Sequence, residues 1–150
     1  MFRGSFEHTL DTKGRLSIPS KFREMLLGKA DDRLIITNFV LEGTRCLDVY
    51  PLDEWLRFEE EIRKKPKFER RMIAFQKYYL GGASECVVDK QGRILVPPRL
   101  RQYANLKRDV VWVSALDKFR VWDNEAWKKV FAEGEEKLMQ DPDFLGDLGL

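Results

Sequence analysis

Two short motifs carry the residue types in this sequence that could do chemistry. Residues 11–15 read DTKGR and residues 89–93 read DKQGR, so an aspartate stands four positions before an arginine in both. A three-residue loop between two strands would bring that carboxylate and guanidinium together at the mouth of a hairpin. The carboxylate can then accept backbone N–H groups of its own turn and pair with the arginine.

The turn itself accounts for four of these residues. Asp11 and Asp89 are predicted to bond their own loops, and Gly14 and Gly92 to supply the positive φ that such a loop needs. We therefore interpret all four as turn-structuring residues.

The arginines are the stronger candidates for contacting a ligand. Arg15 and Arg93 would each hold a planar fork of N–H donors at a fixed turn, which suits a phosphate or the edge of a guanine. Lys13 and Lys90 near the loop tips are predicted phosphate contacts, and Arg3, just before the first strand, is expected to join the same surface. These five residues form the predicted DNA-binding set.

The two motifs belong to a longer internal repeat. At an offset of 78 residues, Asp11 aligns with Asp89, and the matches continue from there. Further pairs are Ile18 with Val96, Pro19 with Pro97, Lys21 with Arg99, and Arg23 with Arg101. At an offset of 72, Tyr50 aligns with Trp122 and Trp55 with Trp127. We expect a first repeat with a helical extension over residues 1–80, and a second with a C-terminal helix and acidic tail over 81–150.

Each repeat predicts the same elements around its motif. In the first we expect strands over 6–10, 15–18, 33–37 and 45–50, a short helix over 21–27 capped by Ser20, and a helix from 51 to about 63. In the second we expect strands over 84–88, 93–96, 109–115 and 118–122, a short helix after 97–98, and a helix from 124. A helix over 67–80 joins them. Strands this short do not form a stable sheet alone, so the repeats should interleave into one barrel-like core.

Charge is distributed unevenly along the chain. The net charge is only +2, but residues 11–23 and 89–101 each hold four basic residues and one acid. Residues 63–71 hold six basic residues and one acid, whereas residues 133–150 hold six acids and one base. A nucleic-acid partner would therefore meet local basic patches. The sequence DPD at residues 141–143 and the glycines after it suggest that the acidic tail is not ordered.

The cysteine content and the hydropathy of the sequence indicate the cellular compartment. Two cysteines without CxxC spacing favour neither a disulfide framework nor a zinc site, and no cofactor motif is present. No apolar leader and no apolar run of about 18 residues occurs. We expect a cytoplasmic protein that binds neither a membrane nor a metal.

Residues 1–23, MFRGSFEHTLDTKGRLSIPSKFR, and the second DKQGR motif resemble the MraZ family, which belongs with the AbrB, MazE and SpoVT swapped-hairpin DNA-binding domains. The resemblance covers the chain except the acidic tail, and the family's motif residues match Asp11, Arg15, Asp89 and Arg93. It implies an α+β fold of two pseudo-symmetric swapped-hairpin (AbrB-like) repeats that form a double-split β-barrel with flanking helices. It also implies a nucleoid-associated transcriptional regulator, expected to repress, that binds repeated double-stranded DNA boxes upstream of the division and cell-wall gene cluster as a ring-shaped homo-oligomer.

Two rival functions follow from the same residues. Asp11 and Asp89 near a pseudo-twofold axis suggest an aspartic-protease dyad, but an arginine four residues after each favours the ionised carboxylate and argues against catalysis. A non-enzymatic alternative is an antitoxin-like or ring-scaffold module whose basic run at 63–71 faces a protein partner. We interpret that run as a solvated helix end and linker.

Overall fold

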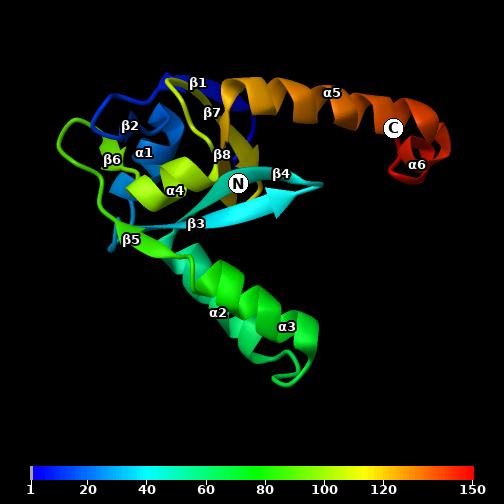
Figure 1. Cartoon of the computed structure of the whole chain (residues 1–150), viewed down its shortest axis with the longest axis horizontal. Coiled ribbons are helices and arrows are strands. Elements are labelled where there is room, and N and C mark those ends of the chain that lie inside the picture. The colour runs from blue at the N-terminus through cyan, green and yellow to red at the C-terminus, as the bar shows by residue number, and fades with distance from the viewer. Residues whose placement is uncertain (1) are drawn as a thin grey trace.

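The computed structural model describes residues 2–150 as a mixed α+β protein (Figure 1). The strands are β1 (Ser5–Thr9), β2 (Arg15–Ser17), β3 (Leu34–Leu41), β4 (Thr44–Pro51), β5 (Ser84–Cys86), β6 (Arg93–Leu95), β7 (Asp109–Ala115) and β8 (Lys118–Asp123). The helices are α1 (Ser20–Leu27), α2 (Leu52–Arg63), α3 (Arg70–Phe75), α4 (Pro98–Tyr103), α5 (Asn124–Gln140) and α6 (Pro142–Asp147), and a π-helical turn, η1 (Gln76–Leu80), continues α3.

Strand pairing joins the two halves of the sequence. A six-stranded antiparallel sheet has the order β1-β7-β8-β4-β3-β5, and β2 pairs with β6 in a separate two-stranded ribbon. The pairs β1–β7, β2–β6, β3–β5 and β4–β8 each combine one strand from either side of residue 81. The expectation of a core shared between the halves is thereby met.

The sheet is open, and the barrel expected from the sequence is not closed by the described strand pairs. Strands β1 and β5 lie at the two edges of the sheet and each pairs with one neighbour. The three-residue strands β2 and β6 bond to each other instead of closing the gap between those edges.

One core lies between the ribbon, the sheet and the short helices α1 and α4. Leu16 and Ile94 stand opposite each other in the ribbon and both are buried in it. Phe22 of α1 meets Phe119 edge-on at 4.9 Å between ring centroids, and Trp112 completes this aromatic cluster. The apolar face of the ribbon therefore packs on the core, and its other face points away from the core.

A second cluster attaches the arm formed by α2, α3 and η1 to the sheet. Tyr50, Trp55 and Tyr79 are buried together there. Beneath them, buried Asp48 accepts hydrogen bonds from the Tyr79 hydroxyl at 2.5 Å and from Arg120 Nε at 3.0 Å. The buried carboxylate is thus paired and bonded, as a charge in a protein interior must be.

Helices α5 and α6 form another arm, which extends away from the ribbon (Figure 1). At the base of α5, the ring centroids of Trp127 and Trp122 lie 6.3 Å apart, and Lys137 Nζ forms an ion pair with Glu42 Oε1 at 2.5 Å. The suggestion of an unordered tail is wrong, because residues 142–147 are helical. Pro142 begins α6, in the first turn, where a missing N–H breaks no helical bond.

Two local expectations are corrected. Ser20 is the first residue of α1 and not its cap, since the preceding Pro19 occupies the capping position without a side-chain bond. The helix expected over 67–80 begins only at Arg70, where the side chain of Glu69 accepts the Met72 N–H and caps it. Across residues 2–150, no helix combines the length and apolar composition needed to cross a membrane.

Candidate nucleic-acid interface

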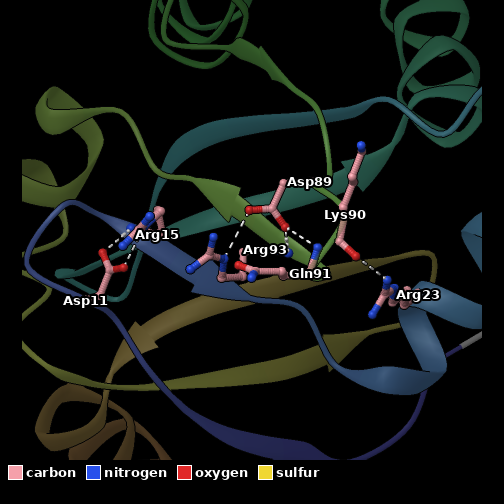
Figure 2. Close-up of polar contacts among 7 residues, drawn as sticks. All are labelled: Asp11, Arg15, Arg23, Asp89, Lys90, Gln91 and Arg93. Carbon is pink, nitrogen blue, oxygen red and sulfur yellow. Dashed lines mark hydrogen bonds and ion pairs between the residues drawn. The ribbon is translucent and has the colours of Figure 1, made fainter.

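The first turn is built by the carboxylate of Asp11. Its Oδ1 accepts the backbone N–H of Lys13 at 2.9 Å. Oδ1 also accepts the backbone N–H of Arg15 at 2.8 Å, and Oδ2 accepts Arg15 Nε at 2.6 Å (Figure 2). Gly14 closes the loop at φ +84°, a conformation that side chains rarely adopt. The predicted turn chemistry is observed in full.

The second turn repeats this geometry bond for bond. Asp89 Oδ1 accepts the N–H groups of Gln91 at 2.8 Å and Arg93 at 2.9 Å, and Oδ2 accepts Arg93 Nε at 3.0 Å (Figure 2). Gly92 has φ +77°. Two equivalent turns therefore stand in one chain.

Both arginines lie on the outward face of the ribbon. Arg15 stands opposite Leu95 and Arg93 opposite Ser17, whereas the intervening pair points into the core. Residues directly opposite in an antiparallel pair share a face, so the two guanidinium groups project from the same side. Each uses Nε on its aspartate, and no hydrogen bond from Nη1 or Nη2 of either arginine is found within residues 2–150. Four terminal N–H donors per arginine remain for a ligand.

The electrostatics of the turns disfavour acid–base catalysis by the aspartates. The backbone hydrogen bond from Arg15 is the main cause that lowers the pKa of Asp11, and the bond from Arg93 acts in the same way on the pKa of Asp89. A carboxylate dyad that shares a proton needs one pKa to be raised. Both carboxylates are instead held ionised by their own turns.

The structure adds two arginines that sequence reasoning did not assign to the site. Arg101 of α4 lies against Gly14, where a Cβ would come within 2.6 Å of its Cζ, and Arg101 Nε donates to the Val96 carbonyl at 3.0 Å. Arg23 of α1 lies against Gly92, and its Nη2 donates to the Lys90 carbonyl at 3.1 Å (Figure 2). Each turn is thus supported by a helix of the other half. The alignment of Arg23 with Arg101 was the signal that could have found them.

The remaining predicted contacts are placed differently. Lys13 and Lys90 are exposed in the two turns that hold the arginines. Arg3 is exposed at the opposite end of β1 from the Asp11 turn, beside Phe2, whose backbone pairs with Leu116. No hydrogen bond or ion pair found in residues 2–150 joins Arg3 to either turn.

Fold and site together define an α+β protein with two equivalent turn-anchored arginines on the outward face of one ribbon. The sequence model of the family described as "MraZ protein, putative antitoxin-like" matches residues 1–77 and 79–145. The chain belongs to the MraZ family.

Curated relatives support this assignment over the full length. A protein of Thioalkalivibrio sulfidiphilus is 43% identical over 129 residues, which cover 86% of this chain and 84% of the relative. One of Pseudomonas fluorescens SBW25 is 41% identical over 151 residues, covering 99% of each chain, and one of Desulfitobacterium hafniense DCB-2 is 39% identical over 150 residues, covering all of both. All three carry the name "Transcriptional regulator MraZ".

Proposed function

We propose that this chain is a transcriptional regulator that binds double-stranded DNA through the outward face of the β2–β6 ribbon. The observation that carries the proposal is the pair of turns, in which Arg15 and Arg93 are fixed by the same two hydrogen bonds and make none through Nη1 or Nη2 within residues 2–150. Such preorganised forks suit the O6 and N7 atoms of guanine in the major groove, or phosphate oxygens. The names of the curated relatives support the regulatory role.

Lys13 and Lys90 would add phosphate contacts around the two arginines, and Arg3 would contact the backbone farther along the duplex. Asp11, Gly14, Asp89 and Gly92 act by holding the turns in shape. The chain would act in the cytoplasm at the nucleoid, without a cofactor.

The two halves would act as one dimer-like unit. We infer that residues 1–80 and 81–150 are swapped-hairpin repeats of the AbrB type, because β2 of one half pairs with β6 of the other and each turn is supported from the other half. Two equivalent reading elements on one chain resemble the arrangement by which dimeric proteins read DNA half-sites.

The preferred target is a set of repeated boxes in the promoter of the division and cell-wall gene cluster, bound by a ring of subunits that represses transcription. One ribbon offers few charges, so a single contact should be weak at physiological salt. Several ribbons on one assembly would bind repeated boxes with avidity.

The test is fluorescence anisotropy with a duplex that carries the repeated boxes, titrated at several salt concentrations. For the wild type, the logarithm of the binding constant should fall linearly with the logarithm of the salt concentration. Arg15→Ala and Arg93→Ala should each weaken binding about tenfold or more, as expected for a lost bidentate base contact of about 1–3 kcal/mol. The matched control is Arg57→Ala, an exposed arginine outside both the ribbon and the run at 63–71, which should bind like wild type.

If both ribbon variants bind like wild type, the site assignment is wrong. If wild type binds no DNA at low salt, the antitoxin-like or scaffold function replaces the proposal. That alternative would fit the description of the family as antitoxin-like.

A further inference from the structure

Two helical arms project from the body in different directions and carry complementary surfaces. One consists of α2, α3 and η1, and the other of α5 and α6; Figure 1 shows their ends well apart. The end of one arm therefore does not reach the other within the same chain. Both arms expose large apolar side chains. Single exposed apolar residues are normal on protein surfaces, but a cluster of them marks an interaction site.

The α5–α6 arm contains an apolar groove of about 780 Å³. Phe131 is 61% exposed and Met139 is 70% exposed along it. The groove is lined by Trp127, Val130, Phe131, Gly134, Glu135, Leu138, Met139, Pro142 and Leu145. Its α5 residues recur every three or four positions, so they form one continuous face of the helix.

Acidic side chains lie at the rim of this groove. Residues 133–150 hold six acids and one base, Lys137, which is engaged by Glu42. Glu135 lines the groove, and Asp141 and Asp143 flank its lining residue Pro142; these three form no ion pair within residues 2–150. An acidic rim repels nucleic acid and attracts a cationic partner.

The other arm ends in a surface of the opposite charge. Its basic tip, residues 63–71, joins α2 to α3 and holds six basic residues and one acid. Phe68 at this tip is 92% exposed, an unusual position for a large aromatic side chain. Lys65, Lys67 and Arg70 around it form no ion pair in the described part of the chain.

We propose that the α5–α6 groove of one copy binds the basic tip of a second copy, with Phe68 in the groove and the tip lysines and arginines against the acidic rim. An aromatic anchor in an apolar pocket surrounded by complementary charge is the arrangement that concentrates binding energy at interfaces. The proposal rests on the assembly part of the proposed function, since it names the two surfaces that would build the oligomer.

Such a contact is head-to-tail. A docked pair still offers one free groove, on one copy, and one free tip, on the other, so association continues until the subunits close into a ring. The β2–β6 ribbon takes no part in the contact and stays available to DNA.

The test is the mass of the protein in solution, measured by sedimentation equilibrium. Phe68→Asp blocks the tip, and its exposure means that the fold does not depend on it. Gly134→Leu fills the groove, since a Cβ there meets nothing within 4 Å, and it replaces a helical glycine by a better helix former. The matched control is Gly146→Leu, a helical glycine of α6 with equally open space that does not line the groove.

Wild type and Gly146→Leu should form multiples of the 17.7 kDa chain, whereas Phe68→Asp and Gly134→Leu should each sediment as monomers. A mixture of those two variants should form heterodimers only, because one intact groove meets one intact tip. Raised salt should weaken all of these complexes.

Three outcomes would overturn the docking. A monomeric wild type at low salt would contradict the assembly as well, and the groove would then belong to a different protein. An oligomer that survives both blocking variants would contradict only the docking surfaces. A mixture of variants that stays monomeric would contradict the head-to-tail contact. Anisotropy of Phe68→Asp on a one-box duplex reports on DNA binding separately, so failure of the ribbon assignment is distinguishable.

Discussion

At the scale of single residues, the aspartate and glycine of each motif have a different role from its arginine. The aspartates and glycines shape the turns, and the arginines keep most of their donors free. Gly14 does more than tolerate a positive φ, because its missing side chain leaves room for Arg101 from the other half. The first turn therefore packs against a residue far away in the sequence.

The chain offers a matched pair of glycines that tests this point. Gly14→Ala and Gly43→Ala both strain a φ near +84°, and each should lose about 1 kcal/mol or more of unfolding free energy for that reason. Only Gly14→Ala also displaces Arg101, whereas a Cβ at Gly43 meets nothing within 4 Å. We expect Gly14→Ala to lose more stability in urea unfolding and to weaken DNA binding in anisotropy. Equal effects in both assays would show that the contact has no role.

At the scale of elements, a buried polar network joins one arm to the sheet. The Tyr79 hydroxyl donates to Asp48 and bonds the Tyr50 hydroxyl at 2.7 Å, and Thr37 Oγ1 donates to the Tyr79 carbonyl at 2.6 Å. Burial raises the pKa of Asp48, and the charge of Arg120 opposes that rise. A network of this kind holds the arm at one position on the sheet, because a shifted arm would leave buried groups unpaired.

Removing one hydroxyl should show how much this network contributes. Tyr79→Phe leaves Asp48 with one fewer donor and Tyr50 with an unpaired hydroxyl, so we expect a loss of about 1–3 kcal/mol in unfolding free energy. The neighbouring Tyr78→Phe removes a hydroxyl that bonds Tyr103 in a half-buried setting, and should cost less. Urea unfolding of both variants gives the comparison. A loss at Tyr79 no larger than at Tyr78 would contradict the proposed anchoring.

At the scale of the whole molecule, the two halves share one sheet and one core. Four strand pairs cross between them, and the shared core draws Leu16 and Ile94 from opposite halves. Neither half keeps a complete sheet or a closed core when taken alone.

We therefore expect one cooperative unfolding transition. Calorimetric and van't Hoff enthalpies of a non-associating variant such as Phe68→Asp should agree. Fragments 1–80 and 81–150, expressed separately, should lack the far-UV circular dichroism of folded protein, and should regain it when mixed. A folded isolated fragment, or two resolved transitions, would show that the halves are independent.

Features that depend on neighbouring residues could be predicted from the sequence. The two turns, the strands before and after Glu42 and Gly43, and the helix near Pro51 were all predicted and are all present, because turn and capping preferences act over a few positions. The alignment of the two motifs also indicated that a pair of equivalent arginines would stand in one chain.

The way in which the repeats combine could not be predicted from the sequence and is seen in the tertiary structure. It placed β2 against β6 outside an open sheet, put Arg23 and Arg101 against the turns of opposite halves, and folded residues 142–147 into a helix that completes the apolar groove. The physical reason is that these features depend on contacts between residues distant in sequence. Local preferences shape each turn and helix, but the free energy of burial in the shared core decides which of them meet.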